Sequence, residues 1–396
     1  MSRAQVMQTT MTRRNVLQTW DLPLILVVMM IVSLGLVMVT SASIPLADKQ
    51  LGQPFYYAER QFFYICAGIA FGLLLIRVPM QQWQKAGPMA LALAFVMLIA
   101  VILPGVGKQV NGSTRWISLG FFQLQVSELA KMLILIYMAG YLVRRGDEVR
   151  ATLRGFIKPM LVLALLVVLL LMEPDFGAAV VLLATALGMM YMAGVGWFKF
   201  ASLLMVTASS MAVLAFISPY RLARLLSFLN PWDDPYKSGF QLTQSLIAFG
   251  RGEWLGVGLG GSIQKLFYLP ETHTDFLYAV IAEELGLFGA IVVILLFSVL
   301  VWRALQIGAR AERAQAYFSA YLAYGIGIWI GLQAFVNMGV NMGVLPTKGL
   351  TLPLMSYGGS SIVVTLGGIA LLLRIGHESM EAEQSTSWQK KAKVSK

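Results

Sequence analysis

The chain contains a single cysteine, Cys66, and only two histidines, His273 and His377, among its 396 residues. One cysteine excludes a disulfide framework and a thiol-ligated metal cluster. Two histidines exclude the zinc chemistry of histidine-rich sites. Charged residues are also scarce, at 12% of the chain, whereas soluble proteins average about 25%. The composition is therefore not that of an ordinary soluble domain.

Long apolar runs occupy most of the chain. Hydrophobic residues make up 58% of it, and many runs approach the roughly 20 residues that a helix needs to cross a bilayer. We therefore expect an all-α polytopic membrane protein with about ten spans. They are expected at residues 22–42, 61–77, 86–104, 128–144, 157–173, 175–193, 198–217, 276–302, 316–344 and 358–376. The eighth and ninth are longer than a bilayer requires, so we expect them to tilt, kink or project beyond it.

The polar segments predict one membrane domain, residues 21–376, between two polar tails, 1–20 and 377–396. About two thirds of the 30 Lys and Arg residues lie on the side of the tails, and positive residues mark the cytoplasmic side. Both termini are thus predicted to be cytoplasmic, and the net charge of +11 requires no nucleic-acid partner. The C-terminal tail mixes charged residues with Ser, Gln and Thr, which predicts disorder.

One long segment, residues 218–275, is predicted to lie outside the cytoplasm. Loops of this length are usually functional or disordered. Alternation of apolar and polar residues around 240–249 favours a helix lying on the outer membrane surface. The glycines between 250 and 261 do not follow a strand, so they do not indicate a nucleotide-binding loop. Any chemistry is expected to face outward.

The most informative residue is Asp275, an acid placed where the polar loop enters the eighth span. Glu271 and His273 precede it, in the sequence Tyr-Leu-Pro-Glu-Thr-His-Thr-Asp-Phe. Ionisable groups at membrane depth are costly, so their presence indicates a functional site. The alternative is a loop whose acids are simply hydrated.

Glu128 and Lys131 stand three residues apart at the start of the fourth span. This spacing places them side by side on one helical face, and opposite charges in a low dielectric are expected to pair. The pair either fixes helix packing or supports a cavity by holding a cation near an anionic substrate.

Several outer residues suit an anionic lipid headgroup. Ser356 and Ser360 belong to a small, hydroxyl-rich segment at the start of the tenth span, where a helix N-terminus attracts anions. Positive charge is expected from three outer loops, at Arg115, Lys265 and Lys348. Asp175 follows Glu173 and Pro174 in a tight outer turn. N-capping alone would also explain Asp175 and the serines.

These motifs together resemble the SEDS family (shape, elongation, division and sporulation) of peptidoglycan glycosyltransferases over residues 20–377. The resemblance rests on Asn230 to Pro235, Gly239 to Gln241, Gly256 to Gly260, Pro270 to Phe276, Asn337, Gly349 to Leu350 and Ser356 to Ser361. Thr272 and the segment 349–356 are more similar to the cell-division branch than to the elongation branch.

The resemblance implies polymerisation of lipid II into glycan strands at the division septum of the bacterial inner membrane. The acceptor 4-hydroxyl would attack the anomeric carbon of the growing chain, and undecaprenyl pyrophosphate would leave. The family's essential acid matches Asp275, and its charged pair matches Glu128 and Lys131. Implied partners are the class B penicillin-binding transpeptidase FtsI and the FtsQ–FtsL–FtsB complex.

Residue chemistry agrees with this assignment, because a hydroxyl nucleophile needs a base and a leaving pyrophosphate needs positive charge or a metal. The sequence specifies no cofactor, and Asp275 is a candidate ligand of a divalent cation, Mg²⁺ or Mn²⁺. His273 is the competing base. Three alternatives stay open: a lipid II flippase, an elongation-type polymerase, and a structural division scaffold.

Overall fold

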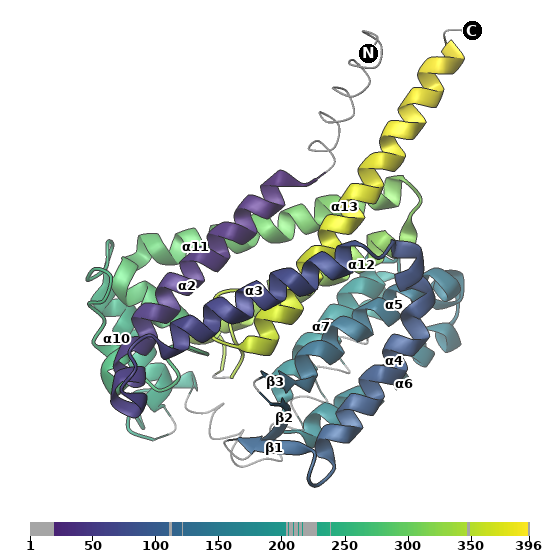
Figure 1. Cartoon of the computed structure of the whole chain (residues 1–396). Helices are drawn as coiled ribbons and strands as arrows, with labels where there is room; N and C mark the ends of the chain where they lie inside the picture. Colours follow the sequence, from purple (N-terminus) through teal and green to yellow (C-terminus); the bar gives the residue numbers. More distant parts are fainter. Residues whose placement is uncertain are drawn as a thin grey trace, which may run out of the picture.

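The computed structural model is a bundle of long helices with one small sheet (Figure 1). It describes residues 20–202 and 228–394 apart from 111–112, 121, 238 and 347–348, and in addition residues 205, 209, 213 and 216. In chain order, the elements are α2 (Leu22–Leu51), α3 (Tyr56–Ile76), α4 (Met80–Ile102), β1 (Gly107–Val110), β2 (Ser113–Leu119), β3 (Phe122–Gln125), α5 (Val126–Ala151), α6 (Leu153–Met172), α7 (Phe176–Met192), α10 (Phe240–Gly252), the π-helical turn η1 (Gln264–Tyr268), α11 (Leu277–Arg313), α12 (Tyr317–Asn341) and α13 (Gly359–Val394).

Eight described helices are long and apolar enough to cross a membrane: α2, α3, α4, α5, α6, α11, α12 and α13. The shorter helix α7 is also apolar. Together they coincide with every expected span except the seventh, residues 198–217, most of which lies outside the described residues. Helices α2 and α3 extend past their expected ends, because polar residues such as Asp48 and Glu59 continue the helix beyond its apolar run.

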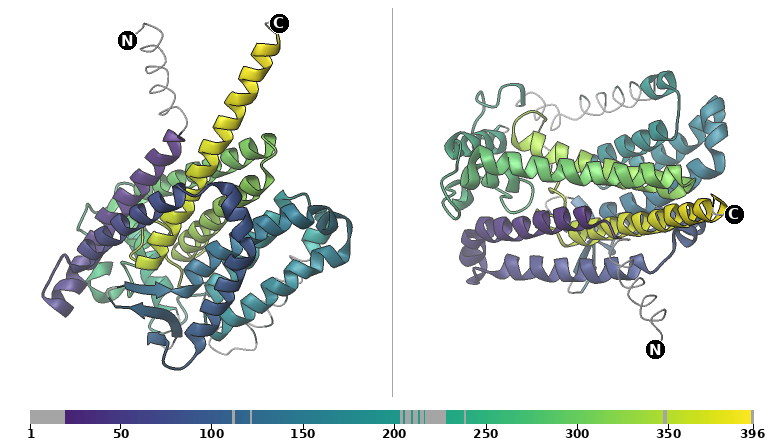
Figure 2. Two further views of the ribbon diagram at one scale, coloured as in Figure 1. Left: turned by 45° about the vertical axis from the view of Figure 1, so that its right-hand side comes forward. Right: turned by 90° about the horizontal axis from the view of Figure 1, so that it is seen from above.

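Helices α5, α12 and α13 form the centre of the bundle. In their most apolar stretches, 83%, 72% and 78% of the residues are buried, whereas the share in the other candidate spans is at most 39%. Figure 2 shows α2 and α3 at the edge of the bundle. Their exposed apolar side chains, such as Phe62 and Leu73, suit contact with lipid. Polar groups that avoid lipid are therefore expected on the central helices.

Helix α11 is broken at Gly286, whose backbone angles are φ 67° and ψ −166°. This kink is one of the three outcomes expected for a span longer than a bilayer requires, which were tilting, kinking or projecting beyond it. Carbonyl groups released at the break accept hydrogen bonds from the segment after α10: Val257 N donates to Glu283 O at 3.0 Å, and Gly258 N donates to Glu284 O at 3.0 Å. The outer loop thus satisfies backbone groups that a broken helix would leave unpaired.

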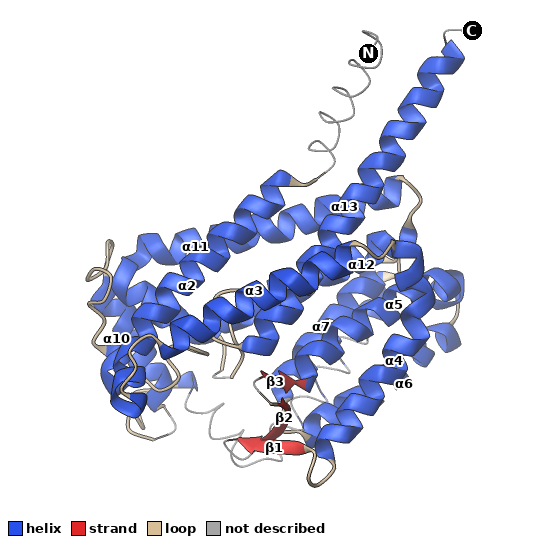
Figure 3. Ribbon diagram, viewed as in Figure 1, coloured by secondary structure: helices blue, strands red, loops and turns tan. Residues whose placement is uncertain are grey.

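The predicted helix of the outer loop is confirmed as α10, Phe240–Gly252. A second feature was not predicted: β1, β2 and β3 form an antiparallel sheet in chain order. Figure 3 shows its strands at the end of the bundle opposite the C-terminal end of α13. Strand β3 runs directly into α5, so the sheet fixes where α5 begins.

Helix α13 continues without a break as far as Val394. The expectation of a disordered C-terminal tail is therefore wrong over residues 377–394. Composition predicted disorder, but the tail continues a helix already nucleated by the tenth span, and propagation adds one hydrogen bond per residue. The start of α2 and the end of α13 lie at the same end of the bundle (Figure 1).

Gly286→Ala tests the break in α11. Its φ lies in a region that only glycine readily adopts, and an added Cβ would lie 2.4 Å from Gly256 N. We expect a loss of about 2 kcal/mol or more in the free energy of unfolding, measured by thermal and denaturant unfolding of purified protein in detergent. Gly250→Ala is the control, because a Cβ there meets nothing within 4 Å. Equal stability of the two variants would contradict the strained break.

Candidate functional site

Asp275 lies in the loop immediately before α11, at the end of the bundle predicted to face outward, and is half-buried. Its backbone carbonyl is held from α12 by two amide groups: Asn337 Nδ2 donates to it at 2.8 Å, and Asn341 Nδ2 at 3.0 Å. The position expected from the sequence, an acid at the boundary between loop and span, is confirmed. The backbone of this acid is thus fixed from a central helix.

The carboxylate of Asp275 lies against the loop between α12 and α13. A Cβ atom at Gly349 would be only 2.9 Å from Asp275 Oδ2, so the carboxylate occupies space that any other residue at 349 would fill. Next in the chain, Leu350 O accepts from Asn337 Nδ2 at 2.5 Å. One amide therefore holds both sides of the site together.

His273 is packed between aromatic rings. Its ring centroid lies 4.7 Å from that of Tyr57 and 5.6 Å from that of Tyr357, and its side chain is only 7% exposed. Burial lowers the pKa of His273, and the nearby Glu271 opposes this effect without reversing it. Because its pKa is below the ordinary value, the imidazole is neutral near pH 7.

Glu271 is exposed, and its Oε2 accepts a hydrogen bond from Thr274 Oγ1 at 2.7 Å. Its φ of 57° is in the left-handed region, which is strained for a residue other than glycine. Glu271 thus shapes the turn that presents Asp275. The chain brings Glu271, His273 and Asp275 together in one short loop, as the sequence predicted.

Glu128 and Lys131 form the expected ion pair on α5, with Lys131 Nζ 2.9 Å from Glu128 Oε1. The two residues are 3% and 1% exposed. Lys131 Nζ also donates to Gln333 Oε1 at 2.7 Å, and this oxygen accepts from Trp329 Nε1 at 3.0 Å. Glu128 Oε2 is buried without a hydrogen-bond partner in the described part of the chain. The pair on α5 is thus hydrogen-bonded to α12 through Gln333.

Gln333 joins this ion pair to the loop beside Asp275, because its Nε2 donates to Thr351 O at 3.2 Å. Gln333, Asn337 and Asn341 are spaced four residues apart, so they line one face of α12. We call these three side chains the amide ladder. Apart from Asn337, sequence reasoning missed it. The available signal was a stripe of amides at helical spacing inside an apolar span.

A second polar cluster lies around Asp175. Its Oδ1 accepts from Ala178 N at 3.2 Å, which confirms the N-cap of α7. Its Oδ2 accepts from Ser127 Oγ at 2.8 Å, and Arg115 Nη1 lies 4.0 Å from Oδ1. Arg115 also donates to Glu173 O at 3.0 Å and to Pro174 O. The cluster fastens the sheet to α5 and to the α6–α7 turn.

Ser360 and Ser356 serve as internal hydrogen-bonding groups. Ser360 Oγ accepts from Gln125 N and donates to Gln123 O, both at 2.8 Å. Ser356 Oγ accepts from Leu352 N at 2.9 Å. The first joins β3 to the start of α13, and the second closes the loop that holds Gly349. Both hydroxyls already have partners that shape the site.

Lys265, in the turn η1, belongs to a third polar cluster, which joins η1 to α11. Its Nζ is 2.8 Å from Glu284 Oε1 and donates to Ser41 Oγ at 3.0 Å. Glu284 is fully buried, so the charge of Lys265 is balanced by a carboxylate rather than left for a ligand. The neighbouring Glu283 accepts from Arg251 Nη1 at 2.5 Å and from Ile263 N at 3.0 Å. Lys348 lies outside the described residues.

Glu173 is a buried acid that the sequence did not single out as a site residue. Both of its carboxyl oxygens lack hydrogen-bond partners in the described structure. Burial raises the pKa of Glu173 to about 8, with a further increase from Asp175 that Arg115 partly offsets. The carboxyl is therefore protonated near pH 7, which avoids an uncompensated buried charge.

Within the described residues, no group of three or more His, Cys, Asp or Glu side chains is arranged to hold a metal ion. Mg²⁺ often binds through one or two carboxylates together with phosphate oxygens of a substrate. Asp275 supplies one carboxylate of that kind.

Comparisons with known proteins identify similar chains. The family model described as "Cell cycle protein", for FtsW, RodA and SpoVE, matches residues 21–381. The "Probable peptidoglycan glycosyltransferase FtsW" of Thioalkalivibrio sulfidiphilus is 56% identical over 365 residues, covering 92% of this chain and 91% of that protein.

Two solved structures have the same fold. One is described as "Structural coordination of polymerization and crosslinking by a peptidoglycan synthase complex", with a TM-score of 0.74 and 28% identity over 91% of this chain and 98% of that one. The other is the rod shape determining protein RodA of Thermus thermophilus, with a TM-score of 0.66 and 26% identity over 91% of this chain and 97% of that one.

Lys131→Met tests the buried ion pair. It leaves Glu128 charged in a low dielectric, so we expect a loss of about 3–5 kcal/mol in the free energy of unfolding. The double variant Glu128→Gln with Lys131→Met removes both charges and should recover most of that loss. Unfolding of the purified variants in detergent measures both effects. A Lys131→Met variant as stable as the unchanged protein would show that the pair contributes nothing to folding.

Proposed function

The chain belongs to the FtsW, RodA and SpoVE family and is a peptidoglycan glycosyltransferase, and we propose that Asp275 is the catalytic carboxylate with which it polymerises lipid II. The observation that supports Asp275 is its placement. It is an acid at the outer end of the bundle, with its backbone held by Asn337 and Asn341 and its carboxylate against Gly349.

The proposed reaction forms one glycosidic bond. The 4-hydroxyl of the acceptor sugar loses its proton to the Asp275 carboxylate as its oxygen attacks the anomeric carbon of the donor glycan. The bond from that carbon to the pyrophosphate oxygen breaks, and undecaprenyl pyrophosphate leaves. A base positioned in this way typically contributes about 10²–10⁴-fold to the rate. The Asp275 side chain is only half-buried, so a substrate hydroxyl can reach its carboxylate.

His273 is the competing base, and its surroundings favour Asp275. The imidazole is buried and packed between Tyr57 and Tyr357, whereas the Asp275 side chain is half-buried and therefore more accessible. His273 instead supports the loop, since His273 O accepts from Tyr357 N at 2.9 Å. We assign His273 and Glu271 to positioning Asp275.

A divalent cation, Mg²⁺ or Mn²⁺, is part of the proposal. Asp275 would supply the protein's carboxylate ligand, together with oxygens of the pyrophosphate. When bound, such an ion would stabilise the negative charge that develops on the leaving group. The amide ladder and Gly349 would orient the same carboxylate whether it takes the proton or holds the ion.

The proposed assignment to septal synthesis rests on similarity. A relative named FtsW is 56% identical to this chain, whereas the RodA structure is 26% identical, which favours division over elongation. We propose a class B penicillin-binding transpeptidase, FtsI, as partner, because the similar synthase complex combines polymerization and crosslinking. The FtsQ–FtsL–FtsB complex is the second proposed partner, as the family resemblance implies.

A lipid II flippase is the alternative from another class. A flippase would move lipid II through the polar interior and would need no base at the outer end of the bundle. The accessible carboxylate of Asp275 therefore favours a glycosyltransferase over a flippase. A division scaffold would not need a buried ion pair joined to the same loop. The role of the ion pair is tested separately: the folded double variant lacking both charges should lose polymerisation if the pair serves the site. Full activity of that variant would limit the pair to packing.

The orientation of the chain follows from its Lys and Arg distribution, and we propose that it lies in the bacterial inner membrane with both termini in the cytoplasm. Reporter insertions at residues 150 and 310 should give a cytoplasmic signal, and an insertion at residue 235 a periplasmic one. Paired alkaline phosphatase and fluorescent protein fusions measure this. A cytoplasmic signal from 235 would place Asp275 on the wrong side for polymerisation.

Asp275→Asn tests the central assignment. The amide keeps the size and most hydrogen bonds of the carboxylate but does not accept the acceptor's proton. We expect normal folding and transpeptidase binding, with polymerisation of labelled lipid II reduced about 10²-fold or more. The measurement is glycan formation by the purified complex, separated on gels. His273→Ala should be milder.

Asp48→Asn is the matched control, because Asp48 is exposed near the C-terminal end of α2 and lies outside the loop that carries Asp275. It should leave the rate unchanged. Near-normal polymerisation by a folded, partner-bound Asp275→Asn protein would require a different base.

A further inference from the structure

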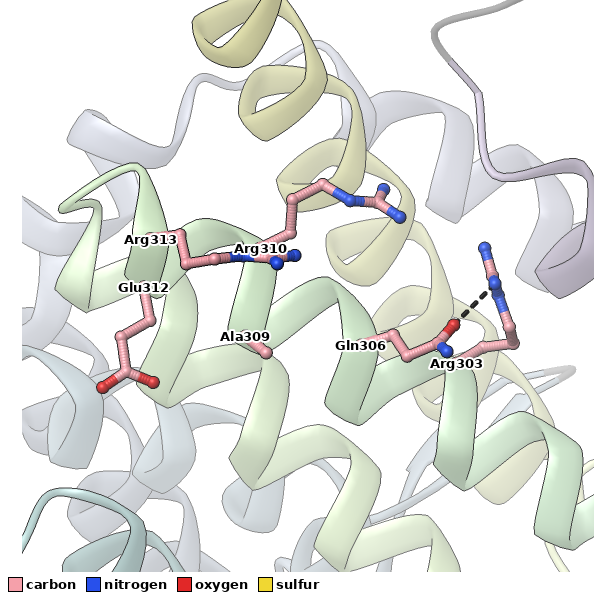
Figure 4. A pocket seen from close by; sticks show the side chains of 6 residues that line it. All are labelled: Arg303, Gln306, Ala309, Arg310, Glu312 and Arg313. Atoms are coloured by element: carbon pink, nitrogen blue, oxygen red, sulfur yellow. Dashed lines mark hydrogen bonds between the residues drawn. The ribbon is translucent and has the colours of Figure 1, made fainter.

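A cavity of about 630 Å³ lies at the C-terminal end of α11, away from Asp275. Figure 4 shows its lining side chains, all from one helix: Arg303, Gln306, Ala309, Arg310, Glu312 and Arg313. The lining contains three guanidinium groups and a single carboxylate. This end of α11 lies on the side of the bundle where α2 begins and α13 ends (Figure 1), the side predicted to be cytoplasmic.

Arg303 forms a fixed wall of the cavity. Its Nη2 and Nε bind Asp21 Oδ2 and Oδ1 at 2.6 and 3.1 Å, and its Nη1 donates to Gln306 Oε1 at 2.6 Å. The charge of Arg303 is therefore balanced. Because the side-chain oxygen of Gln306 accepts from Arg303, the amide nitrogen of Gln306 is the group that can donate to a ligand.

Arg310 and Arg313 differ from Arg303, since neither forms an ion pair within the part of the chain that the structure describes. Arg310 Nη1 is buried and has no hydrogen-bond partner there. The one acid of the lining does not neutralise them: Glu312 Oε2 accepts from Tyr324 Oη at 2.7 Å, and its carboxylate points away from the guanidinium groups (Figure 4). A buried guanidinium nitrogen without an acceptor is costly, so the cavity suits an anion.

The approach to the cavity is apolar. Leu295, Val299 and Trp302 are exposed on α11, at 56%, 41% and 62%. The same alternation of four and three residues continues from Trp302 to Gln306, Ala309 and Arg313. One helical face thus runs from apolar side chains, through a tryptophan, to the cavity. Tryptophan at such a transition is typical of the membrane–water interface.

We propose that this cavity binds the phosphate of an anionic phospholipid of the inner leaflet, such as phosphatidylglycerol, whose acyl chains lie along Leu295, Val299 and Trp302. Arg310, Arg313 and the Gln306 amide donate to the phosphate oxygens. Clusters of basic residues at the cytoplasmic end of a membrane helix are typical binding sites for anionic lipid headgroups, and guanidinium–phosphate hydrogen bonds are among the stronger ones. The site is separate from the polymerisation chemistry and does not depend on the role of Asp275.

The continuous apolar face favours a lipid over a soluble phosphate, because a soluble anion would make no use of the exposed stripe on α11. The excess of guanidinium groups favours an anionic lipid over a zwitterionic one, whose choline or ethanolamine cation would meet the same positive charges. Both distinctions are measurable.

Native mass spectrometry of the full chain in detergent tests the proposal, with phosphatidylglycerol, phosphatidylcholine and glycerol 1-phosphate as probes. The unchanged protein should retain phosphatidylglycerol with a lower apparent Kd than either other probe. The double variant Arg310→Gln with Arg313→Gln should weaken phosphatidylglycerol binding by about tenfold or more.

The control pair is Arg145→Gln with Arg154→Gln, which removes the same charge from exposed arginines outside the cavity. It should bind phosphatidylglycerol like the unchanged protein. Equal losses in the two double variants would show a general charge effect and overturn the site. Retention of phosphatidylcholine or glycerol phosphate as strong as that of phosphatidylglycerol would overturn the assignment to an anionic lipid. Size-exclusion profiles confirm that the compared variants are folded.

Discussion

The amide ladder of α12 is the interaction on which the candidate site depends. Gln333 accepts a hydrogen bond from the Lys131 ammonium and donates one to the backbone carbonyl of Thr351. Asn337 donates to the backbone carbonyls of both Leu350 and Asp275. Asn341 adds a second bond to Asp275. A helix centre in lipid offers no water to these groups, so each donor must find a protein acceptor. Meeting that requirement also fixes the position of the acid.

The same constraint explains the remaining polar clusters. Glu284 is fully buried, and Lys265 and Ser41 satisfy its carboxylate. Asp175 is satisfied by a helix cap and a serine. Each cluster fastens an outer segment to the bundle, so the site is held on central helices rather than on a free loop. Preorganised groups of this kind cost little reorganisation during reaction.

Sequence patterns predicted the spans that the structure describes, the Glu128–Lys131 pair and the position of Asp275, because hydropathy, helical spacing and an acid at a membrane boundary are local signals. The sheet was not predictable, since its strands are short and their pairing depends on the neighbouring helices. Lys265 was expected to face a ligand, but its partner Glu284 lies on another element. The amide ladder required knowledge of which face of α12 meets the α12–α13 loop. The amide stripe itself is visible in the sequence, but the partners that its side chains meet on other elements are not.

The central claim is that the Asp275 carboxylate receives the proton of the acceptor hydroxyl. The most direct measurement is an experimental structure of the complex with a lipid II acceptor and a donor analogue bound. The account predicts that the acceptor 4-hydroxyl oxygen lies about 2.6–3.2 Å from a carboxylate oxygen of Asp275, or that a single water within that distance of both oxygens joins them. An acceptor hydroxyl within that distance of His273, with Asp275 remote from both sugars, would contradict it.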